Sequence, residues 1–186
     1  KAEDEKIKKY SADIIKNTLK MSEFINNFLA YTKDFTADKQ DSDLGKLMEE
    51  AVFELPDNVK NTVIMNNTKP GLHACVDTYL IKKALYNVAL NAYQALDKDK
   101  KEIEIKTGEE NGEAYISVKD NGAGIKSENI KKIYQPFFTG RKEGHGLGLA
   151  IAYKIIHQAH GGDIKVFSEE GKGTEFKLFV GKKSDV

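Results

Sequence analysis

The sequence predicts an α+β fold, in which a mixed sheet is covered on one face by helices and is preceded by a long bundle helix. Three observations predict it. A seven-residue apolar repeat runs through the first 35 residues, several short segments alternate apolar and polar residues, and helical periodicity returns over 78–96 and 146–160. Strands that alternate leave one sheet face to solvent, so we expect all the helices to cover the other face, in a two-layer sandwich.

The first predicted element is a long helix over residues 1–35. A heptad repeat predicts a coiled coil or a helical bundle, and Asn17 is its one polar interruption. The repeat consists of Ile7, Ile14, Met21, Phe28 and Phe35. Such a helix needs a partner helix. The alternative is an amphipathic helix that lies on its own domain.

A linker over 36–42, which has no periodicity, leads into a second domain over 43–186. Ser42 or Asp43 is expected to cap a helix that ends at Leu55, before Pro56, and Asp77 to cap the helix over 78–96. The other predicted elements are strands at 61–67, 72–76, 102–108 and 114–120, a long irregular stretch over 121–145, the helix over 146–160, and a closing hairpin of strands 163–169 and 174–180.

Composition excludes several classes of protein. The 29 basic and 29 acidic residues balance, so nothing indicates binding to nucleic acid. Cys75 is the only cysteine, in what reads as a buried strand, so an internal disulfide is excluded and a reducing compartment is favoured. No apolar run is long enough to cross a bilayer. The chain begins without methionine inside a helical pattern, so we expect a fragment of a longer protein.

Four short motifs concentrate the residues that could carry chemistry. Asn87 and Asn91 lie four residues apart, on one face of their helix. The others are DNGAG at 120–124, GHGLGL at 144–149 and GKGT at 171–174. The glycines before the 146–160 helix indicate a loop that leads into a helix N-terminus, which is a suitable anion site. Taken singly, each motif also fits an ordinary turn, a flexible loop or a solvated surface.

Together and in this order, the motifs resemble those of the catalytic ATP-binding domain of two-component sensor histidine kinases. That domain belongs to the superfamily of DNA gyrase B, Hsp90 and MutL. NVALNA at 87–92 resembles the N box, DNGAG the G1 box, YQPFFT at 134–139 the F box, GHGLGL the G2 box and GKGT the G3 box. The resemblance covers about residues 42–181. It implies a Bergerat-type fold, and it makes the first helix similar to the second helix of the family's dimerisation hairpin.

The resemblance implies an ATP site with Mg²⁺. Asp120 would accept a hydrogen bond from the adenine amine, and Asn91 would be the metal ligand. The loop over 121–145 would be a lid that docks through Phe137 and Phe138. The full set of expected nucleotide contacts is Asn87, Asn91, Gln94, Asp120, Gly122, Gly124, Ile125, Phe138, Gly144, His145, Gly146, Leu147, Gly148, Leu149 and Thr174.

Residue 87 separates a kinase from an ATPase. In the gyrase and Hsp90 branches a glutamate at this position activates water, whereas Asn87 cannot act as a base, so phosphate transfer is expected in place of hydrolysis. Many relatives carry a lysine where Gln94 stands. We expect Arg141, the only arginine, or Lys142 to supply the missing cation, the alternative being a solvated lid charge. The expected catalytic residues are therefore Asn87, Arg141 and Lys142.

None of the four histidines stands in the sequence context of the family's phosphoacceptor. His160 is read as a helix terminator whose positive charge favours the helix dipole. The acceptor histidine, and any sensor, are expected upstream of Lys1. The resemblance implies a response-regulator receiver domain as partner, a homodimeric parent and a cytoplasmic location, whether or not the parent is membrane-anchored. The alternatives are a protein-serine kinase of the anti-sigma type and a non-catalytic ATP-binding module.

Overall fold

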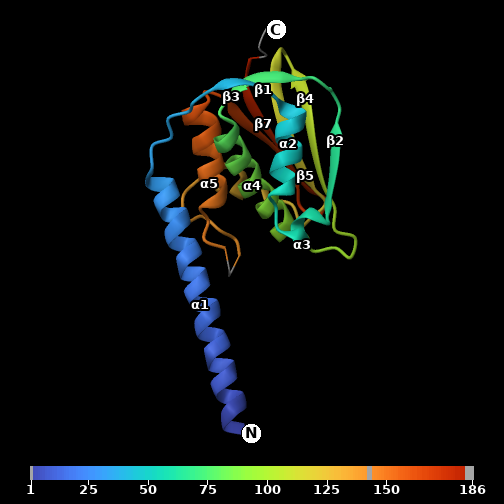
Figure 1. Ribbon diagram of the computed structural model, residues 1–186. Helices are drawn as coiled ribbons and strands as arrows, with labels where there is room; N and C mark the ends of the chain where they lie inside the picture. The colour runs from blue at the N-terminus through green and yellow to red at the C-terminus, as the bar shows by residue number, and fades with distance from the viewer. Residues whose placement is uncertain (1, 142–143, 183–186) are drawn as a thin grey trace. The chain divides into compact units, whose positions relative to one another are not determined.

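The computed structural model describes residues 2–141 and 144–182, and the chain divides after Asp34 into two compact units. The first unit contains the long helix α1 (Ala2–Thr32). The second unit starts at Phe35 and contains every other helix and strand (Figure 1).

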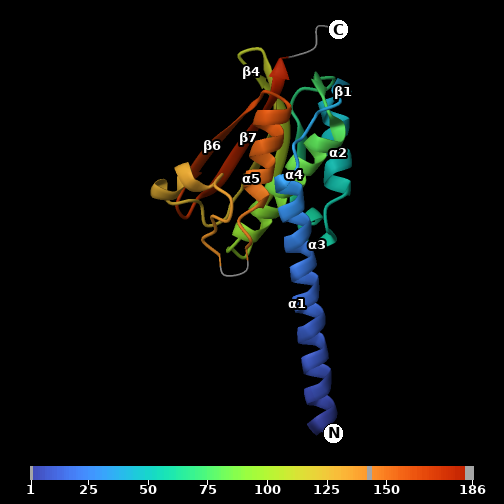
Figure 2. The same cartoon turned by 90° about the vertical axis from the view of Figure 1, so that its left-hand side faces the viewer.

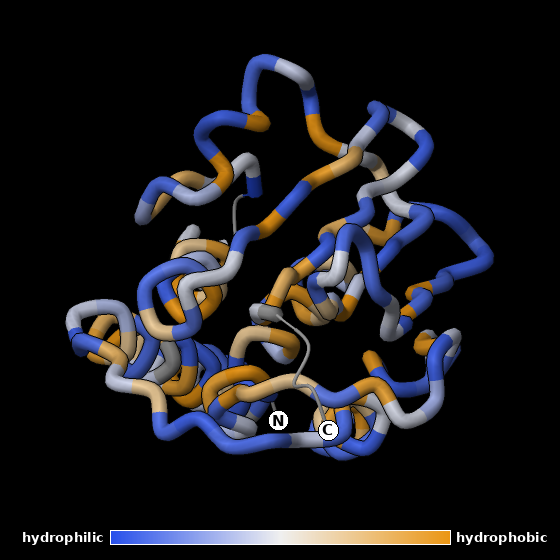
Figure 3. The backbone as a smooth tube through the Cα atoms, turned by 90° about the horizontal axis from the view of Figure 1, so that it is seen from above, coloured by the Kyte–Doolittle hydropathy of each residue, from blue (hydrophilic) through white to orange (hydrophobic). Residues whose placement is uncertain are grey.

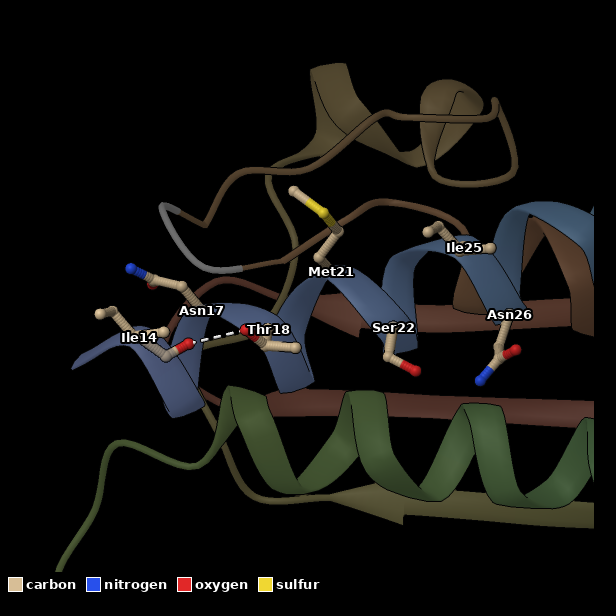
Figure 4. Close-up of a pocket in the computed structure, with 7 residues that line it drawn as sticks. All are labelled: Ile14, Asn17, Thr18, Met21, Ser22, Ile25 and Asn26. Carbon is tan, nitrogen blue, oxygen red and sulfur yellow. Dashed lines mark hydrogen bonds between the residues drawn. The ribbon is translucent and has the colours of Figure 1, made fainter. Parts of the chain in front are cut away.

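Helix α1 presents its apolar side chains to solvent. Ile14, Met21 and Phe28, three members of the heptad repeat, are 65%, 66% and 42% exposed. A shallow groove runs along the helix, lined by Ile14, Asn17, Thr18, Met21, Ser22, Ile25 and Asn26 (Figure 4). The helix ends at Thr32, so it is three residues shorter than predicted. Phe35 falls outside it and belongs to the second unit, where its ring lies near the ammonium groups of Lys83 and Lys154.

The second unit is built on a mixed five-stranded sheet with the order β2-β4-β5-β7-β6. Strand β2 (Val63–Asn67) is parallel to β4 (Ile103–Glu110), and the remaining neighbours, β5 (Glu113–Asp120), β7 (Gly173–Lys182) and β6 (Asp163–Glu169), pair antiparallel. A separate two-stranded ladder joins β1 (Gln40–Asp43) to β3 (His73–Val76). Helices α2, α4 and α5 form one layer along one face of the large sheet (Figure 2), so the predicted two-layer fold is confirmed.

Side chain caps fix where the main helices begin. Asp43 accepts hydrogen bonds from the first turn of α2 (Leu44–Phe53), and Asp77 accepts one from the Leu80 N–H at the start of α4 (Thr78–Ala95). Short helices follow at α3 (Asp57–Lys60) and at the 3₁₀ segment η1 (Ser127–Lys132). The last helical segment is α5 (Gly148–Tyr153), which continues as the π-helix η2 (Lys154–Ala159).

The core lies between the helical layer and the sheet. Its largest fully buried side chains include Phe176, Ile81, Ile105, Ile116, Ile151 and Ile155. Hydrophobic residues are concentrated in the helices and strands, and the peripheral turns are mostly hydrophilic (Figure 3). The hydrophobic effect, at about 25 cal/mol per Å² of buried apolar area, holds the two layers together. The open face of the sheet carries ion pairs, such as Lys177 with Glu110 at 2.8 Å and Lys106 with Glu175 at 3.6 Å.

Three sequence-based expectations need correction. The linker predicted over 36–42 ends at Lys39, because Gln40–Asp43 pairs with β3. The helix predicted over 146–160 begins at Gly148, because Gly146 has a left-handed φ of +66°, and its second half is π-helical. Cys75 is exposed, because Ala74 and Val76 occupy the inward positions of β3. Within the described ranges, no helix has the length and apolar character needed to span a membrane.

Candidate functional site

Helix α4 carries the two asparagines of the predicted site. Its buried face, which includes Ala84, Val88 and Ala92, packs on the core and leaves both amides partly accessible. The Asn87 amide nitrogen donates to the Lys83 carbonyl at 2.8 Å. This bond turns Oδ1 toward the start of α5, where a Cβ on Gly148 would lie only 3.2 Å from it. A glycine at position 148 therefore lets α5 begin against Asn87.

Asp120 is the last residue of β5 and is almost completely buried, with 3% of its surface exposed. Its Oδ1 accepts from the Gly122 N–H at 2.9 Å, and the Thr174 backbone N–H also lies against the carboxylate. Burial raises the pKa of Asp120, although these two N–H groups and the charges of Arg141 and Lys98 oppose the shift. The strand therefore ends in an unusually buried acceptor.

The turn after Asp120 requires glycine. A Cβ on Gly122 would lie 2.2 Å from the Ala95 carbonyl oxygen at the end of α4. Gly124, with φ +71°, would place a Cβ 2.1 Å from the Glu169 carbonyl oxygen at the end of β6. The DNGAG segment thus fits closely between the end of α4 and the β6–β7 turn, and larger residues would force these apart.

Ser168 joins this region through three polar contacts and was not among the predicted site residues. Its hydroxyl accepts from the Ile125 N–H at 2.8 Å, lies 2.8 Å from the Thr174 hydroxyl and donates to the Gly173 carbonyl at 3.1 Å. Thr174 pairs directly with Ser168 across β6 and β7 and with Asp120 across β7 and β5. The signal that could have identified Ser168 was this cross-strand register.

The glycine-rich loop before α5 approaches the backbone of the F-box segment. A Cβ on Gly146 would lie 2.5 Å from the Phe137 carbonyl carbon, and the Gly146 oxygen accepts from the Phe137 N–H at 2.9 Å. Leu147 is buried and occupies the N-cap position of α5, where its side chain makes no capping hydrogen bond. The first N–H groups of α5 are therefore not capped by the side chain at that position.

Arg141, in the segment predicted to be a lid, reaches α4. Its guanidinium donates to the Gln94 side-chain oxygen at 2.9 Å, to the Asn91 Oδ1 at 3.3 Å and to the Asn91 carbonyl at 3.3 Å. Burial lowers the pKa of Arg141, and the charge of Asp120 partly opposes this. Such a group remains charged at every physiological pH. The predicted cation thus lies beside the predicted metal ligand, whereas Lys142 lies outside the described residues.

The remaining predicted contacts lie in or near the 134–149 segment. Phe138, Gly144, His145 and Leu149 are partly exposed. Phe137 does not dock as expected: it is 53% exposed, and its left-handed backbone (φ +65°) directs its amide toward Gly146. No cluster of three His, Cys, Asp or Glu side chains in the described part of the chain is arranged to hold a metal ion.

Comparison with known proteins finds related sequences. Residues 76–184 match the family described as histidine kinase-, DNA gyrase B-, and HSP90-like ATPase. The sensor histidine kinase ZraS of Escherichia coli K12 is 40% identical over 115 residues, 62% of this chain and 24% of ZraS. The signal transduction histidine-protein kinase AtoS of the same strain is 33% identical over 177 residues, 92% of this chain and 28% of AtoS.

Solved structures are similar to this chain as well. The catalytic domain of the histidine kinase ThkA superposes with a TM-score of 0.69 at 28% identity, over 78% of this chain and 96% of that domain. ThkA in complex with the response regulator protein TrrA gives a TM-score of 0.75 at 26% identity, over 91% of this chain and 50% of that one. The chain spans about a quarter of the length of the curated relatives ZraS and AtoS.

Proposed function

Because this chain belongs to the histidine kinase-, DNA gyrase B- and HSP90-like ATPase family, we propose that it binds ATP with Mg²⁺ and transfers the γ-phosphate to a histidine outside the chain. The named relatives are sensor histidine kinases, and the family model matches residues 76–184. The proposed domains are a bundle helix that ends at Thr32, a linker that ends at Lys39 and a catalytic domain that extends from there to residue 186.

The buried carboxylate of Asp120 is the observation that carries this proposal. A carboxylate that is 3% exposed and held by backbone N–H groups costs stability unless a ligand uses it. The exocyclic amine of adenine is a donor that suits this acceptor. Guanine presents an oxygen at the corresponding position, and two facing acceptors repel, so the site should select ATP over GTP.

The opposite side of the site suits phosphates. The loop that contains Gly144 and Gly146 leads into the start of α5 at Gly148, where the N-cap residue Leu147 supplies no side-chain cap. The N–H groups and the helix dipole at this end favour an anion. Arg141 is the cation on this side. Its contacts with Asn91 and Gln94 support our earlier expectation that it takes the role of the missing lysine and binds the γ-phosphate.

We place Mg²⁺ at the Asn91 Oδ1. An amide oxygen suits this hard cation, which keeps several waters and completes its shell with phosphate oxygens. The Nη1 atom of Arg141 lies 3.3 Å from the same oxygen. Metal binding would therefore require the guanidinium either to stay beside the metal or to release the Asn91 Oδ1. When bound, the metal would neutralise charge on the triphosphate.

Asn87 supports transfer over hydrolysis. Its side chain bonds its own helix and faces Gly148, and an amide cannot remove a proton from water. The protein would therefore act by positioning: Asn87 and the start of α5 hold the phosphates, Arg141 stabilises the charge of the loose transition state, and a protein histidine supplies the nucleophile.

The proposal extends to the parent protein. The exposed apolar stripe of α1 supports its assignment to a dimerisation bundle in a homodimer. A receiver domain of a response regulator is the proposed recipient of the phosphate, by similarity to ThkA, which was crystallised with TrrA. We place the chain in the cytoplasm, where the proposed nucleotide is available.

The test incubates the chain with γ-labelled ATP, Mg²⁺ and the acceptor helix of its own parent supplied in trans. We expect a labelled acceptor whose phosphate is lost in acid and kept in base, together with stoichiometric ADP. An acid-stable label would instead support a protein-serine kinase, and bound ATP without ADP would support a non-catalytic module. Unlabelled acceptor in the presence of ATP hydrolysis would contradict the role assigned to Asn87.

A further inference from the structure

His160 is a buried histidine that the proposed mechanism does not use. It is 5% exposed and follows the π-helix η2. The Asp77 N–H donates to its Nε2 at 3.1 Å, so Nε2 must be the acceptor nitrogen. Nδ1 then carries the proton and donates to the Ile155 carbonyl at 2.9 Å. His160 is the C-cap residue of η2, so the expectation that it ends its helix is confirmed. The expected positive charge is wrong, because Nε2 accepts a hydrogen bond and burial lowers the pKa of His160.

His160 and Asp77 together connect three segments of the chain. Asp77 caps α4 through one carboxylate oxygen and accepts from the Asp38 N–H through the other, at 3.0 Å in each case. Lys39 donates to the His160 carbonyl at 3.0 Å. The segment that leads from α1, the start of α4 and the end of η2 therefore meet in one hydrogen-bonded group, which we call the His160 joint (Asp38, Lys39, Asp77 and His160).

The joint lies at one end of a helix pair whose other end forms the proposed nucleotide site. Helix α4 starts at the joint and carries Asn87 and Asn91 further along its length. Helix α5 and its continuation η2 end at the joint, and α5 starts at Gly148. There, Asn87 and Gly148 approach so closely that a Cβ on Gly148 would lie 3.2 Å from the Asn87 oxygen. A small sliding of α5 along α4 would change that approach, and packed helices do shift by such steps.

The π-helical turn also belongs to this arrangement. In η2 the Ile155 carbonyl accepts from both the backbone N–H and the Nδ1 of His160, at 3.2 Å and 2.9 Å. π-helices are rare in proteins, and those that occur are frequently found at functional sites. Here the wider turn brings the imidazole of His160 to the N-terminus of α4.

We propose that His160 is a positioning residue that couples the segment 35–39 to the nucleotide site, by fixing the register of α5 and η2 against α4. The inference rests on the proposed function. A displacement of the segment after α1 would move Asp77 and His160, and through them the contact between Asn87 and Gly148. Coupling of this kind is reciprocal, so nucleotide binding should in turn order the segment 35–39.

Two substitutions separate this role from simple filling of space. His160→Gln places an amide oxygen where Nε2 stands and keeps the bond from the Asp77 N–H. His160→Asn places an amide where Nδ1 stands, so it keeps the local bond to Ile155 and loses the bond to Asp77. The matched control is His157→Gln, because His157 is exposed on the same π-helix and lies 3.1 Å from the Gly162 carbonyl oxygen.

The experiment measures the affinity of each variant for Mg²⁺ and a non-hydrolysable ATP analogue by calorimetry, together with its Tm. We expect His160→Asn to bind roughly fivefold more weakly, the effect of one net hydrogen bond, and His160→Gln and His157→Gln to stay within about twofold of the parent chain. Unchanged affinity in His160→Asn, or an equal loss in the Gln and Asn variants, overturns the proposal. If His160→Asn does not fold, Lys39→Met replaces it, and unchanged affinity in Lys39→Met overturns the proposal equally.

Amide exchange tests the joint independently of nucleotide affinity. In the free chain, the amides of Asp38 and Asp77 should exchange faster in His160→Asn than in His160→Gln, and equal rates overturn the proposal. Addition of the analogue should slow exchange at Asp38 in the parent chain and not in His160→Asn. A parent chain that binds no nucleotide at all refutes the proposed function, whereas the comparison of free variants still tests the joint.

Discussion

At the scale of single residues, the site depends on close approaches that only glycine allows. Gly122 faces the Ala95 carbonyl oxygen, Gly146 faces the backbone of Phe137 with φ +66°, and Gly148 faces Asn87. The spacing of the glycines predicted a loop of special conformation, which the structure confirms. The partner of each glycine could not be predicted, because Ala95 and Asn87 lie far along the chain from Gly122 and Gly148, and no periodic pattern places Phe137 against Gly146.

Gly146→Ala tests the glycine-rich loop. The added methyl group would collide with the Phe137 backbone, and a left-handed conformation costs a residue with a Cβ about 1–3 kcal/mol. We expect lower stability and at least tenfold weaker ATP binding, measured by thermal unfolding and calorimetry. Gly140→Ala, in the same lid, has nothing within 4 Å of the added carbon and should behave like the parent chain. Equal effects of the two substitutions would contradict the assigned role of Gly146.

Asp120→Asn separates binding from stability. The pKa of Asp120 is raised in the fold above its ordinary value of 3.8, so the native state binds its proton more readily than the unfolded chain does. Ionisation of this group therefore destabilises the fold as the pH rises through the native pKa. We expect Asn to lose ATP affinity by at least about tenfold while the Tm at pH 7 stays equal or increases. A lower Tm together with lost binding would indicate damage to the fold.

Arg141→Lys tests the proposed cation of the lid. A lysine keeps the charge but cannot reproduce the fork that reaches Gln94 and both oxygens of Asn91. We expect the rate of phosphate transfer to fall by about 10²-fold, with a smaller change in ATP affinity. Lys100→Ala, which removes an exposed partner of Glu102, is the control. A normal rate in Arg141→Lys would show that charge alone suffices at this position.

At the scale of elements, sequence patterns predicted what local chemistry determines. The caps at Asp43 and Asp77 and the closing hairpin are confirmed, since each depends on residues within a few positions of one another. The strand β1 was missed because QDSD has no apolar alternation, and it forms only by pairing with β3. The π-helix was also missed, because no local pattern encodes the bond that the Asp77 N–H donates to His160 at its end, 83 positions away.

The His160 joint, which links η2 to α4, predicts that the stability of the fold depends on pH. The pKa of His160 is lowered below its ordinary value of 6.5, so the unfolded chain takes up this proton at a higher pH than the native state does. Stability should therefore fall as the pH drops below about 6.5, until the native pKa is reached. The charged groups that face His160 are Lys39, which lowers its pKa, and Asp77, which raises it. Urea unfolding at pH 7 and pH 5 should show a smaller loss in His160→Gln than in the parent chain, and equal losses would contradict this account.

At the scale of the whole molecule, the sequence predicted the family and the fold more securely than it predicted the contacts within the site. Five ordered motifs identified the ATPase family, and the match over residues 76–184 confirms it. The approach of Arg141 to Asn91 and the three contacts of Ser168 required the structure, because residues 50 positions apart, or in neighbouring strands, come together only after folding. The exposed heptad face of α1 stays a prediction about a partner helix.

The most direct test of the central claim is a pair of calorimetric titrations of this chain, one with Mg²⁺ and ATP and one with Mg²⁺ and GTP. We expect saturable heat with ATP, little or no heat with GTP, and loss of the ATP signal in Asp120→Asn. Equal binding of the two nucleotides, or no binding of ATP by a folded chain, would contradict it.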